Sequence, residues 1–129
     1  MASKGTLVVY TFLANETIPV ENAVVTVTMN DGDNPVLLGI RLTDESGRTS
    51  PIIINTPDAE LSLEPQSQIK PFTSVNVRTD HPSAYTVITR NVQIFPNEIS
   101  IENVRMIPLE DDVPPDKTIE YIEITPQNL

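Results

Sequence analysis

Hydrophobic and polar residues alternate along most of this chain, and that alternation predicts strands. The pattern is clearest after Pro19, where Ala23, Val25, Val27 and Met29 share one side of an extended backbone, and the other side carries Asn22, Val24, Thr26 and Thr28. Short β-branched runs separated by turn residues recur throughout, and no long window has helical spacing. Seven strands are predicted, at Gly5–Leu13, Val20–Met29, Val36–Thr43, Pro51–Asn55, Phe72–Thr79, Ala84–Phe95 and Ile99–Ile107. The pattern therefore indicates an all-β sandwich.

Turn residues separate these strands where reversals are needed. Asp44-Glu45-Ser46-Gly47 is a tight turn, because Gly47 can take the positive φ that such reversals often require. Asn30–Pro35 closes the hairpin of the second and third strands. From the alternation we expect a buried set consisting of Ala23, Val25, Val27, Leu38 and Ile40. The segment Thr56–Pro71 is less regular and contains a candidate short strand at Glu60–Leu63.

The last two predicted strands change phase partway along. Apolar residues move from odd to even positions within Ala84–Phe95, and again between Ile101 and Val104. Since a one-residue slip turns every side chain to the opposite face, we expect bulges near Thr89–Asn91 and Glu102–Asn103, across a hairpin closed by Pro96-Asn97-Glu98. The alternative is that this hairpin is covered on its outer face as well, which would be typical of a subunit in an assembly.

The C-terminal part differs in character from the rest. Residues 1–109 form the predicted sandwich domain, residues 110–117 an acidic proline-containing linker, and residues 118–129 a tail strand. A strand that follows a linker must pair on its own sheet edge or on another molecule. The tail residues expected to make that interaction are Ile119, Tyr121, Ile122 and Ile124.

Charge and composition narrow the choice of partners. The chain has 129 residues, a net charge of -10 and no cysteine, so disulfides are excluded and neither nucleic acid nor an anionic membrane is an expected partner. The N-terminal Met1–Gly5 lacks the features of a secretory signal, and no segment has the roughly 20 apolar residues of a membrane span. We therefore expect cytoplasmic synthesis, with a protein partner or self-association through the sheet edge and the tail.

Candidate catalytic and metal-binding groups are few. Asp80 and His81 are adjacent, as an acid–base pair would be, but they precede Pro82 in a turn, and a solvated histidine is the better interpretation. Asn30–Asn34 clusters oxygen ligands without the spacing of a calcium loop. With one histidine and no cysteine there is no zinc set. The sequence thus predicts no enzyme, no cofactor and no metal, and it places Phe12, Tyr85 and Phe95 in the core.

Three stretches resemble a known family. Gly5–Val9, Pro19–Val25 and Leu42–Thr49 resemble the carboxypeptidase regulatory-like, or transthyretin-like, β-sandwich domains. Tyr85–Val87, Asn91–Phe95 and Met106–Leu109 resemble, more narrowly, the N-terminal domain of clostridial spore cortex-lytic enzymes. The resemblance covers nearly the whole chain and implies a seven-stranded antiparallel sandwich of the immunoglobulin-like or transthyretin-like kind with a C-terminal extension strand.

Two non-enzymatic hypotheses about the function remain open, one implied by the resemblance and the other by the tail strand. The first is a non-catalytic accessory module that targets or regulates a lytic enzyme of the spore cortex or cell wall. The second is a self-assembling structural subunit that pairs its tail strand with a neighbour. Related adhesin repeats form lysine–asparagine isopeptide bonds, which we do not expect here, because Lys4 precedes the predicted first strand, although Asn103 is present.

Overall fold

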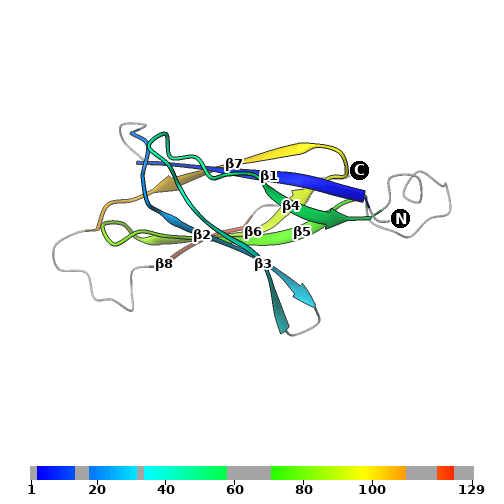
Figure 1. Cartoon of the computed structure of the whole chain (residues 1–129). Coiled ribbons are helices and arrows are strands. Elements are labelled where there is room, and N and C mark those ends of the chain that lie inside the picture. The colour runs from blue at the N-terminus through cyan, green and yellow to red at the C-terminus, as the bar shows by residue number, and fades with distance from the viewer. Residues whose placement is uncertain (1–2, 14–17, 32–33, 58–70, 110–118, 124–129) are drawn as a thin grey trace.

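A computed structural model describes residues 3–13, 18–31, 34–57, 71–109 and 119–123 of the chain. These residues contain no helix and form eight strands in two layers (Figure 1). The strands are β1 (Ser3–Leu13), β2 (Val24–Asp31), β3 (Asn34–Leu42), β4 (Ile52–Thr56), β5 (Thr73–Asp80), β6 (Thr86–Ile94), β7 (Ile99–Met106) and β8 (Ile119–Glu123). The seven strands of the sandwich lie within a few residues of the ranges predicted from the alternation, which confirms an all-β sandwich. The candidate strand at Glu60–Leu63 lies outside the described residues.

The two layers are a three-stranded and a five-stranded sheet. Their strand orders are β4-β1-β7 and β3-β2-β5-β6-β8. One continuous hydrophobic core fills the space between them, because the inward positions of both sheets are apolar. Its members are Leu7, Val9, Val20, Ala23, Val25, Val27, Ile52, Ile54, Val75, Val77, Ala84, Val87, Val92, Ile94, Val104 and Met106.

The sandwich is not wholly antiparallel, so that part of the prediction is wrong. β1 pairs with β7 in parallel, from Thr6 opposite Ile99 to Leu13 opposite Met106, and β8 pairs in parallel with β6. The reason is that β6 and β7 do not form the predicted hairpin. The turn after β6 crosses to the other sheet, where the Asn97 N–H donates to the Lys4 carbonyl (2.8 Å) and the Thr6 N–H to the Glu98 carbonyl (2.9 Å). This crossing delivers β7 alongside β1.

Of the two predicted bulges, one is confirmed and the other is wrong. In β6 the register against β5 shifts between Thr89 and Val92, and Asn91 has a positive φ of 62°, as a bulged residue can. β7, in contrast, keeps an unbroken register with β1. Its phase never changes, because the even positions that include Val104 face the core throughout, and Ile99 and Ile101 face outward.

A further bulge lies in β3 and was not predicted. The register between β2 and β3 shifts between Val27 and Thr28, which inserts Leu38 opposite no partner. Leu38 packs against the core as expected, but Ile40 is turned to the outer face and is 53% exposed, so its predicted burial is wrong. The other predicted core residues are fully buried: Ala23, which directly precedes β2, and Val25 and Val27 within it. Figure 1 shows the end of β2 and the start of β3 projecting beyond the two layers.

The predicted turn at Asp44–Gly47 is confirmed and is tied to β1. Gly47 has a φ of 73°, and the Asp44 side chain accepts hydrogen bonds from the N–H groups of Ser46 (2.9 Å) and Arg48 (3.1 Å). The Thr11 N–H donates to the Gly47 carbonyl at 2.7 Å. The turn therefore covers one end of the sandwich, where the left-handed residue Asn22 (φ 62°) also delays the start of β2 to Val24.

Candidate interaction surfaces

The outer face of the three-stranded sheet is apolar. Ile99 and Ile101 of β7 are 70% and 58% exposed, and Ile53 of β4 is 56% exposed. The register brings them together, because Ile53 and Ile99 both lie opposite Thr6, and Ile101 lies opposite Val8 on the same face of β1. Polar residues usually occupy the outer face of a sandwich sheet. We call this set, Ile53, Val8, Ile99 and Ile101, the isoleucine face.

The isoleucine face is flanked by cations. Lys4 lies at one end of the face on β1, and Arg105 lies at the other end, opposite Phe12. Near the same end, the Arg48 guanidinium lies over the Tyr10 ring, 6.0 Å from its centroid. Among the outward-facing residues of the described β4, β1 and β7, none is acidic. In a chain with a net charge of -10, the strands of this face are therefore electrostatically distinct, and the exposed Glu98, in the turn before Ile99, is the carboxylate next to them.

A second apolar surface lies on the outer side of the five-stranded sheet, along its edge strand β3. Leu37, Ile40 and Leu42 are each more than half exposed, and Val24 lies opposite Leu42. We call these four residues the β3 patch. Exposed carboxylates adjoin its Leu42 end, since Asp44 and Glu45 follow β3 in the turn and Glu21 precedes β2. Carboxylates thus adjoin the Leu42 end of the β3 patch, where Arg41 also lies, whereas the outward-facing charged side chains on the strands of the isoleucine face are cations.

Between the β3 patch and β6, the outer side of the same sheet is hollowed into a polar groove of about 540 Å³. Among the residues that the structure describes, its walls carry hydroxyl, carboxamide and guanidinium groups together with the apolar side chain of Ile88, and no carboxylate. The residues that matter below are Thr26, Thr28, Asn30, Asn76, Arg78 and Arg90. They come from β2, β5 and β6, so only strand pairing brings them together.

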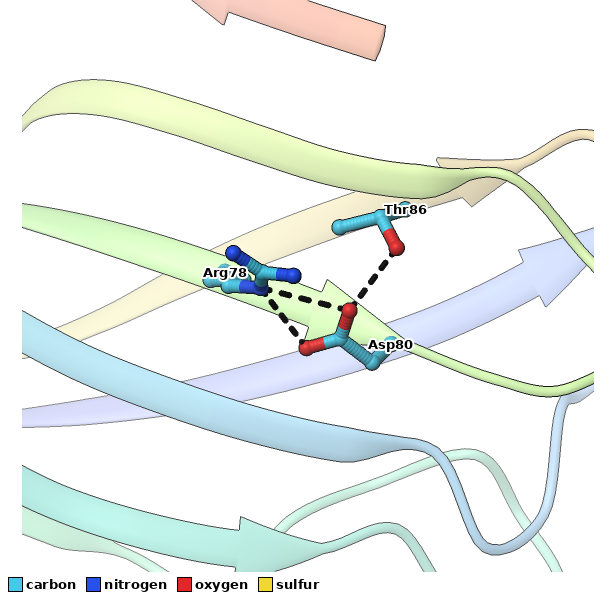
Figure 2. A network of polar contacts seen from close by, with 3 residues as sticks. All are labelled: Arg78, Asp80 and Thr86. Carbon is cyan, nitrogen blue, oxygen red and sulfur yellow. Dashed lines mark hydrogen bonds and ion pairs between the residues drawn. The ribbon is translucent and has the colours of Figure 1, made fainter. Parts of the chain in front are cut away.

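One arginine of the groove is held by a network of side chains (Figure 2). The Nε–H group of Arg78 donates to both carboxylate oxygens of Asp80, at 3.2 and 3.0 Å. The Thr86 hydroxyl donates to Asp80 Oδ1 at 2.8 Å, from the start of β6. Because the carboxylate is itself held, it restrains the guanidinium in one orientation. The network leaves the two terminal nitrogens of Arg78 without a hydrogen-bond partner among the described residues.

This network also decides the role of His81. The Asp80 carboxylate is engaged by Arg78 and Thr86, and the His81 ring instead accepts a hydrogen bond at Nδ1 from the Ser83 N–H (3.1 Å). The structure therefore does not form the histidine–aspartate pair that the sequence brings together. Within the described residues, no group of three or more histidine, aspartate or glutamate side chains is placed to hold a metal ion.

The remaining candidates are dispersed. Lys4 and Asn103, the residue types of an isopeptide bond, both face outward. Asn103 is opposite Tyr10, six positions from Lys4 along β1, so about 20 Å separates the two residues.

The aromatic residues Phe12, Tyr85 and Phe95 are half-buried and outside the core cluster, so their predicted place in the core is wrong. Phe95 instead packs on Phe72, with ring centroids 5.6 Å apart.

The predicted tail residues lie partly in the edge strand β8. The backbone of Ile119, Tyr121 and Ile122 lies in β8, opposite Thr86, Ile88 and Thr89 of β6. Ile124 lies outside the described residues, as does the predicted linker.

No helix in the described part has the length and apolar character needed to cross a bilayer.

Glu102 is the one inward-facing carboxylate of β7, and its burial has a testable consequence. It lies opposite Val9, and burial raises the pKa of its carboxyl above the ordinary value. The folded state therefore binds the proton of this carboxyl more tightly than the unfolded state does. The resulting contribution to the free energy of unfolding is complete below the unfolded-state pKa, and it is lost as the pH rises through the folded-state pKa. Glu102→Gln should therefore raise the melting temperature at about pH 7 and change it little at about pH 4. An equal difference between variant and parent at both pH values would contradict this.

No protein-family model and no curated protein sequence matches the chain. Solved structures share its fold. The chain aligns over 89% of its length with 49% of the minor pilin of the Gram-positive pathogen Streptococcus agalactiae, at 13% identity and a TM-score of 0.54. It aligns over 95% of its length with 59% of catechol 1,2-dioxygenase from Acinetobacter sp. ADP1, at 11% identity and a TM-score of 0.59. The corresponding enzyme of Acinetobacter radioresistens is similar over 93% of this chain and 58% of that one, at 13% identity and a TM-score of 0.53.

The chain thus spans about half to three fifths of the solved chains it matches. At such identities the likeness shows a shared fold alone, which here is a β-sandwich domain. The narrower resemblance to transthyretin-like domains and to cortex-lytic enzymes stays a prediction.

Proposed function

We propose that this domain is a non-catalytic structural module that associates with other copies of itself through the isoleucine face. The observation that carries the proposal is the exposure of Ile53, Ile99 and Ile101 on one sheet face, around Val8. Contiguous exposed apolar surface of this kind is typical of a protein interaction site. The shared fold does not choose between functions, because it occurs in a minor pilin and in catechol dioxygenases alike.

Charge favours a second copy as the partner. Two isoleucine faces packed on each other would bring the cations Lys4, Arg48 and Arg105 of both copies together, which is unfavourable. The β3 patch offers an apolar surface with acidic residues at its margin instead. Contact between the isoleucine face of one copy and the β3 patch of the next joins two different surfaces. Such a head-to-tail contact leaves one surface of each kind free, so it extends into a chain or closes into a ring.

The mass of the protein in solution, measured by light scattering over a wide concentration range, tests this directly. We expect a mass that exceeds one chain and rises with concentration. Ile99→Thr with Ile101→Thr should remove the association without unfolding the domain, because both side chains are exposed and threonine suits a strand. Ile40→Thr with Leu42→Thr should do the same from the other surface.

Mixing the two double variants gives the sharper test. Each retains one intact surface, so a head-to-tail contact predicts that the mixture forms dimers and nothing larger. A parent protein that stays monomeric at every concentration would overturn the proposal. So would an Ile40/Leu42 variant that still associates like the parent.

Two other hypotheses make different predictions. The position of β8 at the edge of the five-stranded sheet favours exchange of this strand between copies, in which case deletion of residues 116–129 should abolish association. Association through the isoleucine face should survive that deletion. The accessory-module hypothesis, which the resemblance to spore cortex-lytic enzymes suggests, predicts a monomer throughout, with a lytic enzyme as the partner.

A further inference from the structure

We infer that the polar groove on the five-stranded sheet is a binding site for a carboxylate-bearing peptide segment. The groove lies between β2, β5 and β6, away from the isoleucine face, and is an open hollow of about 540 Å³. That volume is within the range of ligand pockets in general. The two guanidinium groups of Arg78 and Arg90 line it, and none of the described side chains that line it is a carboxylate. A protein with a net charge of -10 therefore presents here a surface suited to an anion.

Arg78 is the group that would meet the carboxylate. Its Nε–H is engaged by Asp80, and Asp80 is held by Thr86, so the guanidinium is oriented before any ligand arrives (Figure 2). An arginine restrained in this way still presents its terminal nitrogens, which suit the two oxygens of a carboxylate. Preorganisation lowers the entropic cost of binding, because the side chain loses less freedom when the ligand binds.

The rest of the lining favours a peptide over a sugar. Carboxamides of Asn30 and Asn76 each offer a donor and an acceptor, which match the carbonyl and N–H groups of an extended backbone. The hydroxyls of Thr26 and Thr28 add donors and acceptors of the same kind. None of the described side chains that line the groove is aromatic, so these side chains do not form the stacking platform on which sugars commonly pack.

The test uses two synthetic peptides of equal length, one containing three glutamates and the other three glutamines at the same positions. Binding is measured by calorimetry on the full chain carrying Ile99→Thr and Ile101→Thr, so that association between copies does not compete for the neighbouring β3 patch. We expect the glutamate peptide to bind with a dissociation constant below about 1 mM and the glutamine peptide about tenfold or more weakly.

Variants of two arginines then identify the site. Arg78→Gln should weaken binding of the glutamate peptide about tenfold or more, and Arg78→Lys should weaken it less, because the charge remains but the planar fork is lost. Arg41→Gln is the matched control: it removes the same charge outside the groove, from a side chain that donates to the Ile40 carbonyl, and should change binding little.

Three results would overturn the inference. They are equal binding of the two peptides, equal loss in the Arg78→Gln and Arg41→Gln variants, and a dissociation constant above about 1 mM for the glutamate peptide. Since all measurements are made on a protein whose isoleucine face is altered, failure of the head-to-tail association would leave this test unaffected. Failure of peptide binding would likewise leave the test of association unaffected, because the mass measurements need no peptide.

Discussion

Val77→Asp should cost the domain most of its stability. Val77 lies in the middle of β5, is fully buried, and is opposite Val27 on one side and Thr89 on the other. A carboxylate there would be desolvated with no cation beside it, at a cost of roughly 3–5 kcal/mol. Small domains are stable by about 5–15 kcal/mol, so the change should be large in a denaturant titration monitored by circular dichroism.

Ser74→Asp is the matched control for this change. Ser74 lies on the same strand but is exposed on the outer face, so an added carboxylate there remains hydrated. We expect its effect on unfolding free energy to stay within about 0.5 kcal/mol. If both variants lost the same stability, or if Val77→Asp lost none, the assignment of β5 to the centre of the sandwich would be wrong.

The second large effect is expected from Gly47→Ala. Gly47 has a φ of 73°, which costs a residue with a side chain about 1–2 kcal/mol. An added Cβ would also overlap the Thr11 carbonyl oxygen and press on Pro19 Cβ and Val20 N, each 3.2 Å away. Since Thr11 donates to the Gly47 carbonyl, the turn cannot move without breaking that hydrogen bond. Together these effects should lower the unfolding free energy by roughly 2–4 kcal/mol.

Ser46→Ala tests the same turn without changing its backbone. The Ser46 side chain is exposed, and the hydrogen bond from this residue to the Asp44 carboxylate uses its backbone N–H. We therefore expect a loss of less than about 0.5 kcal/mol in the same titration. A Gly47→Ala variant as stable as Ser46→Ala would show that the turn adopts another conformation in solution.

The candidate surfaces were only partly predictable from the chain. In β7 the apolar residues Ile99 and Ile101 have odd numbers, whereas Val104 and Met106 have even numbers. This change in the alternation was the signal in the sequence for the isoleucine face. It had two explanations, a bulge in one strand or an apolar outer face. Alternation alone cannot separate them, because it shows that a strand has two unlike faces without showing which of them another layer covers. The groove left no local signal, since its residues are distant in sequence.

What the sequence determined by itself is the set of strands, the turn at Gly47 and the bulge in β6. These depend on neighbouring residues: the period of two, the positive φ open to glycine and asparagine, and a phase change within one strand. Tertiary structure decided the crossing between β6 and β7, the parallel pairing of β7 with β1, and the bulge that turns Ile40 outward. Those features depend on contacts between residues far apart in the chain. The physical reason is that strand pairing is made through backbone groups that every residue shares, so partner and direction are settled only when the two layers close over a common core.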